Sequence, residues 1–194
     1  MRWRSAGAGR THESCAVPNK AVYVPFIKRN HYFHGKFLTE KDLSDEQHYF
    51  REKQRLLNLN IFGWGSVSGL HVSAGKSDIT VAPGMALDGY GREIVLMKRA
   101  TIPLPKKRLC WWVVVQYAER QTDPVPVRGN GGDTSQPSRI EEGVEISYAS
   151  ENPCDQKMTK NAGPECIAIA KLTWKHSGWR VAKRLPCPRV STRR

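Results

Sequence analysis

Three histidines and several acidic residues have the side chains from which metal sites are built, and they lie within one block of the chain. The block holds His31, His34 and His48, with Asp42 and Asp45 between the second and third histidines. His31 and His34 precede a predicted helix, and no HExxH pair places two imidazoles one helical turn apart. We therefore interpret these side chains as structural and predict no metal site.

A pair of carboxylates for acid–base chemistry could be built from Asp45, Glu46 and Glu52. All three fall on the same predicted helix, and Glu52 precedes Arg55 at the spacing of a surface ion pair. No Ser or Cys stands in a GxSxG setting. The glycine-rich DGYGR and GNGGD segments lack the GK[ST] sequence and following helix of a phosphate loop. The sequence predicts no catalytic centre and no cofactor, so we expect a protein that is not an enzyme.

The helix that carries these acids is predicted over about residues 39–61. Thr39 and Asp42 match a variant of the capping box, in which two side chains satisfy the free N–H groups at a helix start. An apolar stripe follows at helical spacing, formed by Leu43, Phe50, Leu57 and Ile61 and widened by Tyr49 and Leu56. Because only one face is apolar, we expect the helix to pack on the rest of the protein.

The period becomes strand-like after Gly65, which favours an antiparallel sheet of short strands. Strands are predicted at 66–72, 78–81, 85–87, 93–97, 109–118, 144–148, 166–175 and 179–183. The Gly-, Pro- and polar-rich segment 119–142 is predicted as a long loop. The predicted fold class is α+β: mainly antiparallel β-sheet, as a small barrel or sandwich, with one amphipathic N-terminal helix packed on it.

The predicted organisation is a flexible arm over residues 1–20, a single domain over 21–185 and a basic tail over 186–194. The net charge is +13 for 194 residues, and no Asp or Glu follows Glu165. Such an excess favours acidic or polyanionic partners. Trp174, Trp179 and Arg180 alternate with lysines in a predicted hairpin, which leaves a small nucleic-acid-binding or ribonucleoprotein component as the alternative function. We expect the two tryptophans to pair across the strands.

The five cysteines are odd in number and widely spaced, and no CxxC pair suggests a zinc ribbon. The N-terminal segment also lacks the apolar stretch of a secretory signal, and no run approaches the ~20 apolar residues of a membrane span. We therefore expect free thiols in a reducing compartment, with Cys110 in the core. Cys154 and Cys166 flank a loop and are expected to stay unpaired, although the sequence leaves that pairing open.

Three motifs in fixed order resemble a bacterial family with the pattern YFxGxxLTxxDFxxEQxY, then GWGxVxGL, then PGxALDxxGxEIV. The matching segments are YFHGKFLTEKDLSDEQHY, GWGSVSGL and PGMALDGYGREIV, and the resemblance covers about residues 30–148. The chain departs from the pattern at Leu43, where Phe is usual, and at Ser66, where Val is usual. The family is associated with phage-tail-like contractile injection systems, in their baseplate or spike region.

The resemblance implies a structural subunit of a multi-protein particle, made in the bacterial cytoplasm and then part of a virion or an injection system. It implies other protein subunits as partners, with a homo-oligomer as an option, nucleic acid as a less favoured partner and no membrane span. Local rules leave Tyr32, Phe33, Tyr49 and Trp64 unexplained, so we expect this aromatic set to join helix to sheet. The full set of predicted interaction residues is Tyr32, Phe33, Tyr49, Phe50, Trp64, Trp174, Trp179 and Arg180.

Overall fold

The computed structural model describes residues 27–105, 109–129, 132–155, 163–175, 178–182 and 187–190. The chain divides into two compact units, Met1–Tyr49 and Phe50–Arg194. Helix α1, Glu40–Leu57, begins in the first unit and continues into the second. It is followed by the π-helical turn η1, Asn58–Phe62. The predicted helix over residues 39–61 is therefore confirmed, but its last turn is wider than an α-helix.

The start of α1 is capped as its sequence predicts. The Thr39 N–H donates to Asp42 Oδ2 at 3.0 Å, and the Asp42 N–H donates to Thr39 Oγ1 at 3.2 Å. The Thr39 hydroxyl also donates to Asp42 Oδ2 at 2.6 Å. These reciprocal hydrogen bonds satisfy N–H groups that the helix itself cannot. The acidic residue at the third helical position is thereby a structural part of the helix start.

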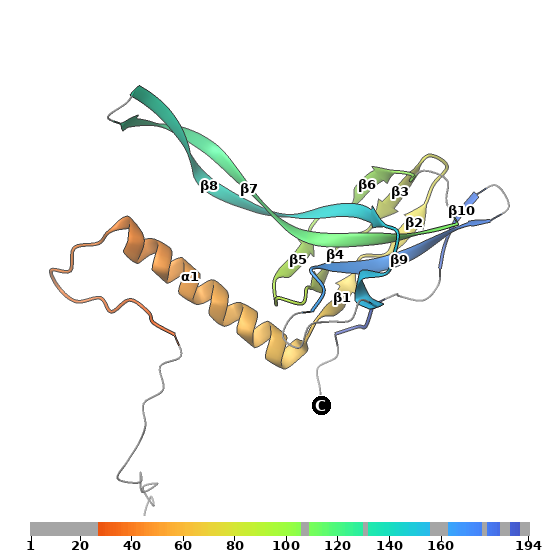
Figure 1. The fold of residues 1–194 in the computed structure, drawn as a ribbon, viewed down its shortest axis with the longest axis horizontal. Coiled ribbons are helices and arrows are strands. Elements are labelled where there is room, and N and C mark those ends of the chain that lie inside the picture. The colour runs from red at the N-terminus through yellow and green to blue at the C-terminus, as the bar shows by residue number, and fades with distance from the viewer. Residues whose placement is uncertain are drawn as a thin grey trace, which may run out of the picture. The chain divides into compact units, whose positions relative to one another are not determined.

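The second unit contains three antiparallel sheets, which confirms the predicted α+β class (Figure 1). One sheet contains β1 (Gly65–Gly69), β4 (Gly84–Leu87) and β5 (Glu93–Leu96). Another contains β2 (Val72–Ala74), β3 (Asp78–Val81) and β6 (Ala100–Pro103). The largest has the order β10 (Gly178–Val181), β9 (Cys166–Lys175), β7 (Cys110–Gly129) and β8 (Gly132–Ala149). A short 3-10 turn, η2 (Pro153–Asp155), follows β8.

All three sheets contribute to one hydrophobic core. Its fully buried side chains include Ile79 of β3, Ile94 of β5, and Val113, Ile167 and Leu172 of the largest sheet. The near-continuous apolar run at 109–118 is thus explained, because β7 is the strand between β9 and β8 and packs on this core. The predicted strands over residues 66–118 and 166–183 agree with the observed ones to within a few residues, with two exceptions. Strand β6 was not predicted, and the single strand predicted over 66–72 covers β1 and only the first residue of β2, which belongs to a different sheet.

The end of the helical segment packs on the sheet through a polar contact. The Asn58 side chain is 4% exposed and donates to the Gly91 carbonyl oxygen at 3.0 Å and to Glu93 Oε1 at 3.1 Å. Gly91 has φ +77°, and a Cβ there would overlap the Arg55 carbonyl oxygen. The close approach of Gly91 to the helical backbone determines which helix face meets β5. The apolar stripe lies on a different face. Leu43, Phe50, Leu57 and Ile61 are all between 45% and 59% exposed.

The predicted long loop over 119–142 is wrong. Strands β7 and β8 continue through it as a two-stranded ribbon, in register from Trp112 opposite Ala149 to Gly129 opposite Gly132 (Figure 1). Strand β9 pairs with β7 only as far as Gln116, so the ribbon beyond has no buried face to impose an apolar alternation. Its three prolines are tolerated because Pro124 faces Pro137, a pair in which neither residue can donate to the ladder between the strands. Pro126, two residues on and opposite Ser135, occupies the same kind of pair.

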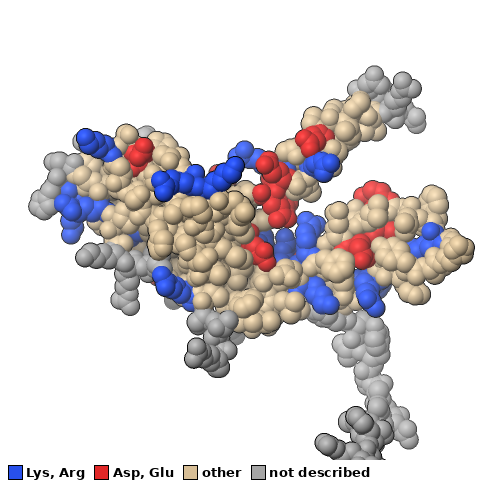
Figure 2. All heavy atoms as spheres, turned by 180° about the vertical axis from the view of Figure 1, so that it is seen from behind, with Lys and Arg blue, Asp and Glu red and all other residues tan. Residues whose placement is uncertain are grey.

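Charges nearly balance over the described residues. They carry almost as many Asp and Glu as Lys and Arg, so the net charge of +13 comes almost entirely from segments outside them. Figure 2 shows basic and acidic side chains side by side on one face of the molecule. Most of the described surface in this view is formed by uncharged residues. The predicted arm over residues 1–20 lies outside the described residues, and so do 191–194 of the predicted tail. No helix within the described ranges is long and apolar enough to cross a membrane.

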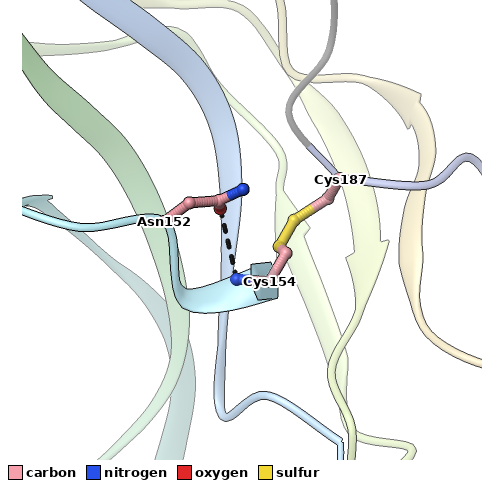
Figure 3. The surroundings of a disulfide bond; sticks show 3 residues. All are labelled: Asn152, Cys154 and Cys187. Atoms are coloured by element: carbon pink, nitrogen blue, oxygen red, sulfur yellow. Dashed lines mark hydrogen bonds between the residues drawn. A yellow bond between two sulfur atoms is a disulfide. The ribbon is translucent and has the colours of Figure 1, made fainter. Parts of the chain in front are cut away.

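The predicted tail over 186–194 is wrong for residues 187–190, which belong to the folded unit. Cys187 forms a disulfide with Cys154, beside the hydrogen bond that the Cys154 N–H donates to Asn152 Oδ1 (Figure 3). The Ser66 N–H donates to the Pro188 carbonyl at 3.1 Å, and the Val190 N–H donates to the Ser66 carbonyl at 3.0 Å. The free-thiol prediction fails for this pair because connectivity cannot be deduced from spacing.

Cys110 and Cys166 are free thiols, as expected. Both are partly exposed, and Cys110 therefore lies at the margin of the core instead of inside it. Burial raises the pKa of the Cys166 thiol, and the charge of Glu165 adds to this effect. The thiol is thereby kept protonated and less reactive. Cys15 lies outside the described residues.

Candidate interaction surfaces

The histidine and acid block is used for local structure. Asp42, besides capping α1, pairs with Lys36 at 2.9 Å, and Asp45 pairs with Lys41 at 2.9 Å. The ring of His31 lies 6.3 Å from the ring of Phe33. Across the part of the chain that the structure describes, no three His, Cys, Asp or Glu side chains form a group that could hold a metal ion.

Hydrogen bonds from Thr39 and Lys36 hold the pKa of Asp42 well below its ordinary value. The ionised Asp42 carboxylate therefore stabilises the folded protein fully when the pH is above its unfolded pKa of about 4. This stabilisation is lost as the pH falls through the lower pKa of Asp42 in the folded protein. We expect Asp42→Asn to speed amide hydrogen exchange in the first turn of α1 at about pH 6, with the difference from wild type shrinking as the pH is lowered. Asp45→Asn removes an exposed ion pair and should leave that turn unchanged; equal effects of the two variants would contradict the cap assignment.

The predicted aromatic set does not share one environment. Trp64 packs against the hydrophobic core. Tyr32 and Phe33 are exposed, and Lys36 Nζ lies 5.2 Å from the Tyr32 ring centroid. The joining of helix to sheet by Tyr32, Phe33 and Tyr49 stays a prediction, and Trp64 alone of the four is placed on the core.

Trp174 and Trp179 face each other across β9 and β10, as predicted from the hairpin. Their rings meet edge to face with centroids 5.3 Å apart, and Trp179 also packs on the core. Rings engaged in this way are not open platforms on which bases stack. Arg180 is exposed and lies opposite Thr173. Together with the balanced charge of the described residues, this geometry does not favour the nucleic-acid alternative.

One charged cluster was not predicted from the sequence, in which DGYGR was interpreted only as a turn. Asp88 is fully buried and accepts hydrogen bonds from the Tyr90 N–H at 2.9 Å, the Arg92 N–H at 2.8 Å and Arg92 Nε at 2.5 Å. Arg92 also lies 5.3 Å from the Tyr117 ring centroid and 3.5 Å from Glu165. Burial opposes the charge of Arg92, but Asp88 and Glu165 together outweigh it and leave the arginine pKa raised. This cluster joins the β4–β5 turn to β7.

A small cavity beside this cluster is lined by the helix end, the β4–β5 turn and Tyr117. Its volume is about 120 Å³, well below the ~300–1,000 Å³ of typical ligand sites. Its arginines are paired: Arg55 with Glu52 at 2.7 Å and Arg51 with Glu119 at 3.8 Å. We interpret the cavity as a packing gap in an ionic network, not as a binding site.

Two groups of exposed apolar side chains stand out on the described surface. The helix stripe consists of Leu43, Phe50, Leu57 and Ile61. The ribbon patch consists of Val125 and Val127, which share a face of β7, and of Ile140 of β8, which lies farther along the ribbon opposite Gln121; all three are more than 40% exposed. Groups of exposed large apolar side chains, unlike single ones, are typical of protein contact sites.

Comparison with known proteins gives a likeness of fold. No family model matches the sequence, and no curated protein matches it. The fold is similar to that of a chain in the type VI secretion system TssK-TssF-TssG baseplate subcomplex, at 13% identity and a TM-score of 0.53, covering 84% of this chain and 62% of that one. It is also similar to a chain in the baseplate complex from the type VI secretion system, at 11% identity and a TM-score of 0.51, covering 84% and 60%. This chain thus spans about three fifths of each.

Proposed function

We propose that this protein is a structural subunit of the baseplate region of a contractile, phage-tail-like particle, and that it performs no catalysis. The observation that carries the proposal is the fold shared with chains of type VI secretion baseplates over 84% of this chain. The ordered motifs of the sequence favour the same class of assembly. Two independent lines, one from sequence and one from fold, therefore support a role in a multi-protein particle.

The helix stripe and the ribbon patch are where neighbouring subunits would bind in such a role. Burial of an apolar side chain contributes about 1.5–3 kcal/mol, so each surface could supply much of the free energy of a specific contact. The ribbon favours contact through its faces, because the prolines at 124 and 137 leave its outer edges without N–H donors at those positions. A subunit held through such surfaces needs no active site.

The test is the composition of the native complex that contains this chain. The protein would be tagged in its host, complexes isolated without denaturation, and their components identified by mass spectrometry. We expect sheath, tube and baseplate proteins to copurify. A stand-alone monomer that brings down no particle component would refute the proposal.

A matched pair of substitutions tests the helix stripe as a contact. Leu57→Glu places a charge in the stripe, whereas His48→Glu places the same charge nine residues away, on the opposite side of α1. We expect Leu57→Glu to reduce the copurified particle proteins by about tenfold or more, as loss of an interface anchor does. The His48→Glu variant should retain them, and equal losses in the two variants would argue against the stripe.

A further inference from the structure

A groove lies between the end of the helical segment and residues 188–190. Its volume is about 460 Å³, within the ~300–1,000 Å³ range of binding sites. One wall is formed by η1 and the turn after it, with Ile61 and Phe62 52% and 39% exposed. The other wall is formed by Pro188, Arg189 and Val190. Ile61 also ends the helix stripe and Trp64 packs on the core, but the space between these residues and 188–190 belongs to neither.

The wall at 188–190 has an unpaired strand edge. The Pro188 carbonyl and the Val190 N–H both bond to Ser66 of β1. In an extended segment alternate residues direct their backbone groups to opposite sides, so the N–H and C=O of Arg189 point away from β1. Within the described ranges, neither group has a backbone hydrogen-bond partner. An unpaired edge of this kind is a template for an added strand.

The charge in the groove is also unmatched. Arg189 is exposed, and no carboxylate among the described residues lies within 4.0 Å of its guanidinium. The other residues that line the groove carry no charge: Leu59, Asn60, Ile61, Phe62, Gly63, Trp64, Pro188 and Val190. The ligand that best complements this lining is mainly apolar, with one acidic group for the guanidinium.

We propose that this groove binds an extended, apolar segment of a partner protein by strand addition at Arg189. The segment's backbone exchanges hydrogen bonds with the Arg189 N–H and C=O, its apolar side chains contact Ile61 and Phe62, and a carboxylate meets the guanidinium. A helix is a poorer occupant, because it satisfies its own backbone groups and leaves the edge unpaired. The site goes beyond the proposed function, since it assigns a peptide-binding groove that would operate in whichever assembly the protein joins.

The groove is preformed in the absence of a ligand. The Cys154–Cys187 disulfide and the two hydrogen bonds to Ser66 fix the 187–190 wall. Gly65 makes this pairing possible, because a Cβ there would overlap the Pro188 carbonyl oxygen. A site that is already ordered loses less conformational entropy when a ligand binds, and this favours affinity.

The test uses the full chain and an immobilised library of hexapeptides. Alternate positions carry Val, Ile, Leu or Phe, and one end carries Asp; control peptides carry Lys in place of Asp, or Pro in the middle. We expect the protein to prefer the uninterrupted Asp peptides over both controls by about tenfold. Binding without such a preference, or no binding to the library at all, overturns the proposal.

Two variants assign the contact to the groove. Ile61→Glu should lose binding by about tenfold, whereas Met97→Glu, at an exposed apolar residue outside the groove, should not. Arg189→Glu should lose the Asp peptides and gain the Lys peptides, a reversal that misfolding cannot produce. If Ile61→Glu instead changes the molar mass in light scattering while peptides fail to compete, the face binds a second copy and the peptide assignment is wrong. Failure here would leave the copurification result for the proposed function untouched.

Discussion

Asp88→Ala is expected to lower the free energy of unfolding by about 3–5 kcal/mol, the cost of removing one partner from a buried ion pair. The carboxylate is fully buried and is the shared acceptor for three donors, from Tyr90 and Arg92. Alanine would leave two backbone N–H groups without an acceptor and a guanidinium with only a distant one. Equilibrium denaturation in urea, followed by tryptophan fluorescence, measures the loss.

The matched control is Glu165→Gln. Glu165 also faces Arg92, at 3.5 Å, but its side chain is 56% exposed. Solvent screens such a pair, so its removal should cost less than about 1 kcal/mol. Asp88→Asn should fall between the two, because the amide keeps one acceptor and loses the charge. An Asp88→Ala variant as stable as Glu165→Gln would show that the cluster does not hold the β4–β5 turn.

Loss of the Cys154–Cys187 disulfide has the second large expected effect. The two cysteines are 33 residues apart in the sequence. A cross-link that closes a loop of this size is expected to stabilise the protein by about 3–4 kcal/mol, chiefly by restricting the unfolded chain. The double variant Cys154→Ser, Cys187→Ser should therefore unfold at lower urea than the wild type under oxidising conditions.

Reduction provides the internal comparison for that variant. The wild type in a thiol reductant should unfold where the double variant does, and the double variant should be insensitive to the reductant. Cys166→Ser, at a free thiol, should keep both the stability and the response to reduction of the wild type to within about 1 kcal/mol. A wild type whose unfolding midpoint ignores the reductant would mean that the bond does not form in solution.

The features that sequence reasoning predicted correctly depend on neighbours in the chain. The Thr39–Asp42 cap follows from two residues three apart, and the pairing of Trp174 with Trp179 follows from a tight turn between two short strands. The fold class followed in the same way, from helical periodicity giving way to short alternating runs. Such signals are strong because the geometry of one turn decides them.

The features that were missed depend on contacts made far along the chain. The face of the helical segment that meets the sheet is set by Asn58 of η1 and by the close approach of Gly91 to Arg55, and the apolar stripe predicts a different face. The ribbon at 119–142 has the composition of a loop because neither of its faces is buried. Its strands are recognised only from the residue pairs between β7 and β8, which the sequence does not reveal. The groove joins residues 59–64 to 188–190, and no local pattern connects these segments.

The pairing of Ser66 with residues 188–190 also has a consequence for the order in which the protein folds. During synthesis β1 can pair with β4 soon after both leave the ribosome, since few residues separate them. Its other edge must wait until nearly all of the following sheet has been made. Contacts of such high sequence separation form slowly, because a long loop must close first. The nascent chain therefore carries an open strand edge at Ser66 from the synthesis of β1 until residues 188–190 have been made.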